Sequence, residues 1–246
     1  MELLTFDNLI AFVTLSALEI VLGIDNVVYI AILCARLPEQ QRDKARFWGL
    51  LLAMGIRILL LMCIDWLAKL TTPLFAISVM DHAFEPSVRD LVLGVGGLVL
   101  MAKAVLEMHH QVESPHDPTK PSVKRAALSI ILAQICLMDI IFSIDSVITA
   151  VGMANNLTIM ITAIVVAVLV MMIFAGAVSR VIERHPTLKT LALSFLVLIG
   201  AALILESVHI PFPKGAIYFT MAFSLVIEMI NLRVRAKTSA RAQSAE

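Results

Sequence analysis

The chain alternates between long apolar runs and short polar segments. About seven of the runs reach the roughly 20 residues that a helix needs to cross a bilayer. We expect these spans near residues 9–35, 47–69, 90–108, 126–153, 157–179, 188–207 and 214–232. Helices are expected because open strands leave backbone groups unpaired in lipid, and the alternating pattern of a transmembrane barrel is absent. The partly apolar segment 71–87 is too short to cross, and we expect it to form a lid or a re-entrant piece.

Composition points to the same fold class. Apolar residues make up 60% of the chain and charged residues 15%, whereas soluble domains are nearer half apolar with about a quarter charged. The sequence therefore predicts an all-α, polytopic transmembrane bundle surrounded by the lipid bilayer. A formal net charge of zero, with no basic run interleaved with aromatic residues, gives no reason to expect nucleic acid as a partner.

Lys and Arg are shared unequally between the two sides of the predicted bundle. They gather in the connections after the first, third and fifth spans and in the tail 233–246. The connections on the other side contain only Lys69, Arg89 and Lys214. Basic loops stay in the cytoplasm, so we expect an integral protein of a bacterial inner membrane with its N-terminus outside and its C-terminal tail inside. An odd number of spans agrees with this orientation.

Two short stretches share one arrangement of polar residues. Residues 19–28 read EIVLGIDNVV and residues 139–148 read DIIFSIDSVI, and we call them the acidic motifs. Three spans separate them, so the second copy enters the membrane in the opposite direction, as in an inverted repeat. The third and sixth spans agree, because GLVLMAKAVLEMHH and FLVLIGAALILESVH align Glu107 with Glu206. We therefore expect one transmembrane domain of two three-helix repeats, about 9–108 and 126–207, followed by an extra helix at 214–232.

Polar residues inside the spans form the candidate site, because intramembrane acids by default mark ion or proton paths. Two antiparallel spans related by a twofold axis would bring the polar residues of the acidic motifs around one point. These candidate metal ligands are Glu19, Asp25, Asn26, Asp139, Asp145 and Ser146. The candidate charge partners or members of a proton path are Arg57, Lys103, Glu107, Glu206 and Glu228. For Glu206 and Glu228, which lie near span ends, a purely structural role is an equal alternative.

The donor atoms of this set indicate the kind of ligand. Carboxylate, amide and hydroxyl oxygens are hard ligands, which suit magnesium, calcium or manganese and leave the choice among them open. The HExxH and GxSxG signatures are absent and no Ser, His and Asp set is suggested by spacing. We therefore expect neither an enzyme nor a resident cofactor, and the divalent ion would be the cargo.

Helical geometry sets a difficulty for the site. In each acidic motif the first acid and the last polar residue lie on one face of a continuous helix, whereas the second acid falls about 120° away. One straight helix therefore cannot aim all three groups inward. Gly23 and Ser143 occupy matching positions between the acids, and we expect a local break or unwinding there that turns Asp25 and Asp145 toward the centre.

The same stretches resemble a known family. The acidic motifs, LPEQQRDKARFWGLLLAMGIRILLL after the first of them, GLVLMAKAVLEMHHQVE in the third span and YFTMAFSLVIEMINL in the last are similar to the TerC family of integral membrane proteins. The resemblance runs through nearly all of the chain. It implies export of metal ions, manganese in particular, and it implies that the six polar residues of the acidic motifs are the ligands.

We therefore expect a divalent-cation exporter with alternating access, in which protons replace the ion once it has left. One alternative is a membrane-embedded assembly factor that works beside the protein-export machinery and supplies metal to secreted enzymes. Another is an exporter of a tellurium oxyanion or an organic solute. An acidic centre suits an anion poorly, since anions prefer helix N-termini or Arg, and Arg57 is its only ready partner.

Overall fold

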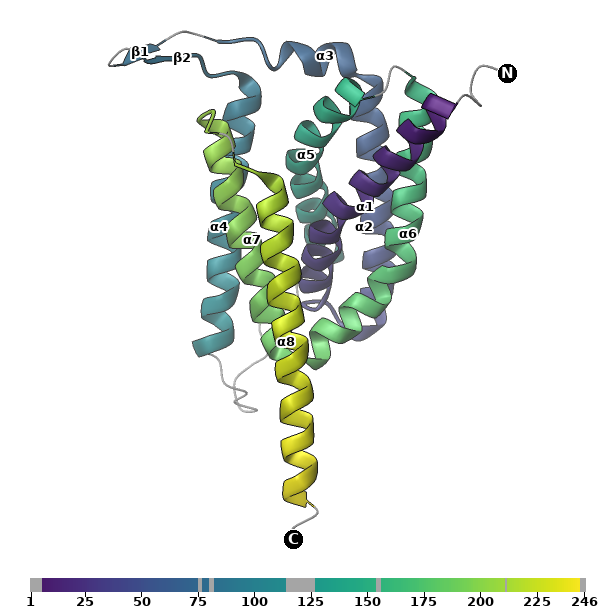
Figure 1. Cartoon of the computed structure of the whole chain (residues 1–246), viewed down its shortest axis with the longest axis vertical. Coiled ribbons are helices and arrows are strands. Elements are labelled where there is room, and N and C mark those ends of the chain that lie inside the picture. The colour runs from purple at the N-terminus through teal and green to yellow at the C-terminus, as the bar shows by residue number, and fades with distance from the viewer. Residues whose placement is uncertain are drawn as a thin grey trace.

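The computed structural model describes residues 6–74, 77–79, 82–113, 127–153, 156–210 and 212–243. Within these residues the chain forms eight helices and one short hairpin (Figure 1). In chain order the elements are α1 (Phe6–Cys34), α2 (Glu39–Met62), α3 (Ile64–Lys69), β1 (Ile77–Val79), β2 (His82–Phe84), α4 (Val88–Glu113), α5 (Leu128–Met153), α6 (Leu157–Arg184), α7 (Pro186–Ser207) and α8 (Lys214–Gln243). The predicted all-α bundle is confirmed.

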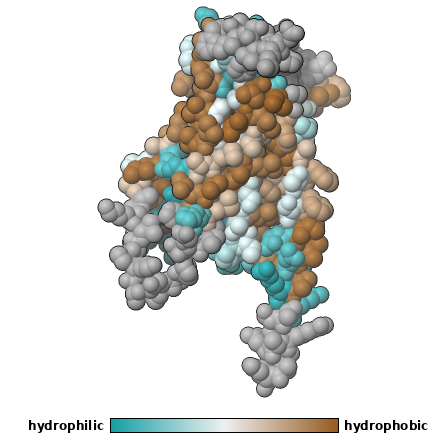
Figure 2. Space-filling model, turned by 90° about the vertical axis from the view of Figure 1, so that its left-hand side faces the viewer, coloured by the Kyte–Doolittle hydropathy of each residue, from teal (hydrophilic) through white to brown (hydrophobic). Residues whose placement is uncertain are grey.

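The long helices have the length and composition of membrane spans. Helices α1, α2, α4, α6, α7 and α8 are each long and apolar enough to cross, and α5 contains a shorter apolar stretch, Leu128–Ile144, within its 26 residues. Apolar side chains also cover the outside of the bundle, as Figure 2 shows for one face. Leu91, Val95, Leu98 and Val105 of α4 are among these exposed side chains. Exposed apolar surface of this extent belongs in lipid, so the chain is an integral membrane protein.

Several predicted boundaries are wrong by a few turns. Helix α2 begins at Glu39, directly after Pro38, and ends at Met62, where the chain turns into α3. Its first turns are held by packing, since Ala45 and Gly49 are buried, and this tertiary contact extends the helix beyond the apolar run. Helix α8 continues to Gln243, because the Arg, Lys and Ala residues of the predicted tail are good helix formers.

The segment between α3 and α4 forms a hairpin at one end of the bundle. Strands β1 and β2 are antiparallel, with Ile77 opposite Phe84 and Val79 opposite His82. The hairpin and α3 lie at the end where α1 begins (Figure 1). The described part of this segment does not pass between the helices, so the re-entrant alternative is wrong.

The helices pack in pairs that respect the predicted repeat. Helix α1 packs on α6, α5 packs on α2, and α4 packs on α7. Exchanging α1, α2 and α4 for α5, α6 and α7 leaves these pairs unchanged, which is what a twofold relation between two halves requires. The helices of each exchanged pair run in opposite directions (Figure 1), so the arrangement is that of an inverted repeat.

The backbones of α4 and α7 approach each other closely at two glycines. A Cβ placed on Gly97 would lie 2.6 Å from the carbonyl oxygen of Gly200, and a Cβ on Gly200 would lie 2.8 Å from that of Gly97. Only glycine lets two backbones approach this closely, and small residues at helix crossings are typical of membrane bundles. We infer that α4 and α7 form a tightly packed pair.

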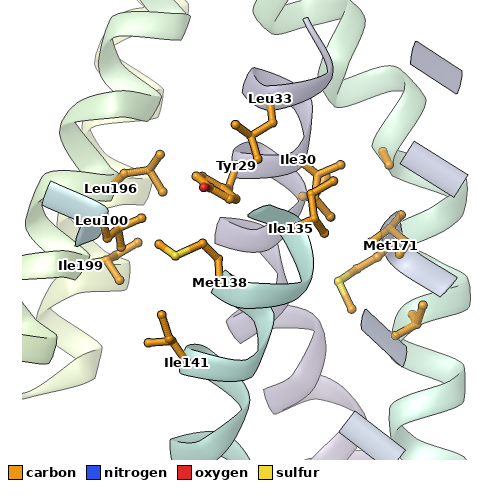
Figure 3. Close-up of a cluster of buried hydrophobic side chains, with 14 of the residues drawn as sticks. Tyr29, Ile30, Leu33, Leu100, Ile135, Met138, Ile141, Met171, Leu196 and Ile199 are labelled. Atoms are coloured by element: carbon orange, nitrogen blue, oxygen red, sulfur yellow. The ribbon is translucent and has the colours of Figure 1, made fainter. Parts of the chain in front are cut away.

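An apolar layer joins the two halves at the middle of the bundle (Figure 3). Tyr29 and Leu33 from α1, Met138 from α5, Leu100 from α4 and Leu196 from α7 are all buried in it. These residues follow the acidic motif along α1 and precede it along α5. Because the two helices are antiparallel, the layer lies on one side of the acidic motifs, toward the end where α1 finishes.

Candidate metal-binding site

A buried cation sits between carboxylates from the two acidic motifs. Arg57 of α2 donates from Nη1 to Oε2 of Glu19 on α1 at 2.5 Å. It also donates from Nη2 and Nε to Oδ1 of Asp139 on α5, at 2.9 and 3.2 Å. The exposed fractions of Glu19, Arg57 and Asp139 are 5%, 3% and 4%, so these three ion-paired side chains are buried in the bundle. We call these three residues the Arg57 cluster.

The Asp139 carboxylate has further partners from both motifs. Asn26 Nδ2 donates to its Oδ1 at 3.4 Å, and Ser143 Oγ donates to its Oδ2 at 3.2 Å. Ser146 lies one turn further along α5 and donates from Oγ to the carbonyl oxygen of Ser143 at 3.3 Å. The first acid and the amide of one motif therefore meet the first acid of the other at the centre of the bundle.

The predicted helix breaks are wrong, because α1 is helical from Phe6 to Cys34 and α5 from Leu128 to Met153 without interruption. The reason lies in the contacts of the two residues that suggested a break. A Cβ on Gly23 would overlap the sulfur of Met171 on α6, so glycine allows α1 to pack closely there. Ser143 is fully buried and bonds Asp139 one turn back, which leaves the helix intact.

A continuous α1 turns Asp25 away from the Arg57 cluster. Asp25 instead lines a cavity of about 80 Å³, which we call the central cavity, together with Arg57, Ser146 and Glu206. Apolar residues from α1, α5, α7 and the start of α8 complete its wall. This volume holds several water molecules, so a partly hydrated ion fits. The side chain of Asp145, the matching acid of the second motif, lies outside the described part of the structure.

The central cavity lies on one side of the Arg57 cluster. Glu206 lies in the last turn of α7, Phe212 lies just before α8 and Tyr218 lies near the start of α8, so the cavity extends toward the end of the bundle where α1 begins. On the other side of the cluster stands the apolar layer of Figure 3. We call the end of the bundle on the side of the cavity the hollow end, and the end on the side of the apolar layer the packed end.

Ion pairs lie at both ends of the α4–α7 pair. Near the packed end, Glu107 of α4 accepts from Lys189 Nζ of α7 at 3.1 Å and forms a second ion pair with Arg36. Near the hollow end, Glu206 of α7 accepts from Arg89 of α4 at 2.8 Å. In each case an acid near the end of one helix meets a basic residue at the start of the other, which agrees with the predicted alignment of Glu107 with Glu206.

Two of the predicted charge partners lie elsewhere. Lys103 is exposed on α4 and takes no part in the ion pairs of the Arg57 cluster. Glu228 lies ten residues beyond the cavity residue Tyr218 on α8 and accepts from Asn231 Nδ2 at 3.4 Å. At about 1.5 Å per residue this places it roughly 15 Å along the helix from the cavity. Of the five predicted partners, Arg57 enters the central cluster and Glu206 the cavity wall.

The donor set suits a hard cation, but its centre holds a guanidinium. The carboxylates of Glu19 and Asp139, the Asn26 amide and the Ser143 hydroxyl meet in one region, and oxygens of these three kinds bind magnesium, calcium and manganese. Among the side chains that the structure describes, no three from His, Cys, Asp and Glu gather closely enough to hold a metal ion. Arg57 keeps Glu19 and Asp139 on either side of itself.

Sequence reasoning did not name Arg36 or Lys189 as partners of Glu107. Both stand at helix ends beside apolar runs, and basic residues there reach back along the membrane surface to an acid one turn inside. A pattern search for such end positions facing a span-end acid would have selected them. Which acid each basic residue meets depends on helix packing.

A polytopic bundle with ion-paired acids at its centre and apolar side chains on its outside is characteristic of integral membrane proteins that handle polar cargo. The TerC family of integral membrane proteins matches residues 4–243, and the chain belongs to this family. It is 52% identical over 226 residues to a UPF0053 protein of Haemophilus influenzae, covering 92% of this chain and 94% of the relative.

Two further relatives come from Escherichia coli strain K12. The UPF0053 inner membrane protein YgdQ is 49% identical over 223 residues, which cover 91% of this chain and 92% of YgdQ. The UPF0053 inner membrane protein YoaE is 45% identical over 218 residues, which cover 89% of this chain but 41% of that longer protein. No solved structure matches the chain.

Proposed function

We propose that this protein exports divalent metal ions, manganese foremost, by alternating access to the carboxylates of the acidic motifs. One observation carries the proposal. Glu19 and Asp139, from the two inverted motifs, converge on a single buried positive charge at the centre of the bundle. A pair of carboxylates that holds a guanidinium in the membrane interior is suited to hold a metal cation in its place.

The energetics favour a functional role for this charge. An acid or a base at the centre of a span costs roughly 2.5–3.5 kcal/mol to insert. Well-packed apolar residues of similar volume are often as stable as a buried ion pair, or more so. The Arg57 cluster is therefore not the most stable way to fill this space, and cation handling gives a reason for its presence.

The ligand chemistry narrows the cargo. Hard oxygen donors suit manganese, magnesium and calcium, whereas copper and zinc favour nitrogen or sulfur. An ion that binds at a buried cluster beside a cavity of about 80 Å³ must lose part of its hydration shell, and magnesium dehydrates reluctantly. Manganese and calcium meet both demands, and of these two the resemblance to the TerC family implies manganese.

The described conformation corresponds to one state of the proposed cycle. The central cavity leads from Asp25 toward the end where α1 begins, while the apolar layer and the Glu107 ion pairs close the other end. With the N-terminus outside, as the Lys and Arg distribution predicts, this is an outward-facing state. Rocking of the two repeats would open the Glu107 end to the cytoplasm. The names of YgdQ and YoaE, inner membrane proteins, support the same location for this chain.

Export of an oxyanion is less well supported by the geometry. An anion at the centre would have to compete for the guanidinium, and each of the three nitrogens of Arg57 already donates to Glu19 or Asp139. Metallation of secreted enzymes beside the protein-export machinery would need a partner, whereas an exporter works alone. Reconstitution of the purified protein separates these two possibilities.

The test is manganese flux in liposomes that contain only this protein. We expect Mn²⁺ loaded inside to leave down its gradient, and we expect the flux to be lost in Asp25→Asn and Asp139→Asn. Asp43→Asn, an exposed acid that pairs with Arg46 on α2, is the control and should transport normally. Absence of flux from the intact protein, or normal flux from both Asp25→Asn and Asp139→Asn, would contradict the proposal.

A further inference from the structure

Arg57 occupies the position that a transported cation would take. Its three nitrogens donate to one oxygen of Glu19, at 2.5 Å, and to one oxygen of Asp139, at 2.9 and 3.2 Å. A metal ion cannot bind both acids while the guanidinium lies between them. For a protein that binds a divalent ion with these acids, the described arrangement is therefore a state in which the side chain has replaced the ion.

We propose that Arg57 is a tethered substitute for the exported ion, which leaves the carboxylates when metal binds and returns when metal has gone. The inference rests on the proposed function, because it concerns the same site. It assigns to Arg57 the task of neutralising the emptied acids, so that the unloaded protein can complete its cycle without a second cation at this pair.

The structure provides a place for Arg57 when metal is bound. Arg57 lines the central cavity as well as bonding Glu19 and Asp139, and the Asp25 carboxylate lines the same cavity. Asp25 is about 120° around α1 from the Glu19 face, so it is not part of the Arg57 cluster. A guanidinium that leaves Glu19 and Asp139 can therefore pair with the Asp25 carboxylate, which lines the same cavity of about 80 Å³.

The charges account for why such a substitute is needed. Two carboxylates a few ångströms apart repel each other in a low dielectric, and a buried charge without a partner is strongly unfavourable. An emptied site without Arg57 would have to take up protons or another cation before the helices could close around it. With Arg57 between them, the two acids remain ion-paired while the empty protein returns to the other side.

The inference separates two modes of transport that liposomes can measure. Exchange of radioactive Mn²⁺ for unlabelled Mn²⁺ across the membrane requires only the loaded protein to move. Net efflux of Mn²⁺ into a metal-free medium also requires the empty protein to return. We expect Arg57→Gln to continue exchange but to lose net efflux by at least about tenfold, while Arg46→Gln on the same helix keeps both.

Metal binding should change in the same variant. A tethered competitor leaves the site free for only a fraction of the time. The apparent affinity for Mn²⁺ is the intrinsic affinity multiplied by that fraction. Arg57→Gln should therefore bind Mn²⁺ at least about tenfold more tightly than the intact protein. If Arg57 only orients Glu19 and Asp139, its removal should instead weaken binding and reduce both modes together. That result, or unchanged net efflux in Arg57→Gln, overturns the inference.

Two further outcomes are distinguishable. No exchange and no net efflux in the intact protein would show that the proposed function itself is wrong. If Arg57→Gln does not fold, Arg57→Lys serves in its place, because Lys keeps the charge but not the forked donor geometry. Arg57→Lys should keep both modes and bind Mn²⁺ more tightly than the intact protein, and weaker binding would overturn the inference.

Discussion

Removing the two carboxylates of the Arg57 cluster one at a time and then together should reveal how they share one buried cation. Glu19→Gln removes the carboxylate that receives Nη1 at 2.5 Å, and Asp139→Asn removes the one that receives Nη2 and Nε. After either change Arg57 still has one carboxylate beside it. After both, a buried guanidinium with 3% of its surface exposed has none in this cluster.

The magnitudes follow from the contacts. A hydrogen bond to a charged group contributes about 1.5–3 kcal/mol, so Glu19→Gln should lower the free energy of unfolding by ~2 kcal/mol. Asp139→Asn takes the negative charge from the acceptor of two such bonds and should cost ~4 kcal/mol. An unpaired buried charge costs about 3–5 kcal/mol more, and the double variant should therefore lose more than the sum of the two single losses.

The assay is reversible unfolding in mixed micelles, with the helix content followed by circular dichroism. Asp43→Asn is the control, because its ion pair with Arg46 lies on the exposed side of α2 and should contribute about 0–0.5 kcal/mol. Single variants as stable as the control would refute the reasoning. So would a double variant that loses no more than the sum, since the carboxylates would then not share Arg57.

The helix contacts and the closed end give further predictions. Gly97→Ala should destabilise the bundle by about 1–3 kcal/mol, because the added Cβ meets a backbone carbonyl oxygen. Gly23→Ala should destabilise it by less, because the added Cβ meets the flexible side chain of Met171. Unfolding in micelles measures both losses, and the reverse order would contradict the described packing. Glu107→Gln should weaken the closure of the packed end by ~1 kcal/mol. Cys34 is fully buried at that end, so its labelling by a maleimide should become about fivefold faster. An unchanged labelling rate would show that the Glu107 ion pairs do not hold the packed end shut.

Some of this architecture follows from one-dimensional pattern. Apolar run lengths fix the number of long helices, and two motifs with matching polar order predict their antiparallel relation. Helical periodicity alone places Glu19 and Asn26 on one face and Asp25 on another, and α1 keeps this arrangement. These features depend on spacing within one helix, which the sequence states directly.

Other features depend on which helices touch. The position of Gly23 between two acids that one straight helix cannot aim inward predicts a break, but Met171 of α6 packs against Gly23 and the helix continues. Lys103 was a candidate partner for the same reason as Arg57, a charge in an apolar run, yet it lies on the outside of α4. Only the rotation of each helix against its neighbours decides between such cases, and a single sequence carries little of that information.

The central claim is that acids from both motifs hold one hard cation inside the membrane, and direct binding of Mn²⁺ tests it best. Free Mn²⁺ gives a sharp electron paramagnetic resonance signal that weakens on binding. We predict saturable loss of this signal with the intact protein, and no such loss with Glu19→Gln combined with Asp139→Asn. Undiminished binding by that double variant would show that the ion, if carried, is held elsewhere.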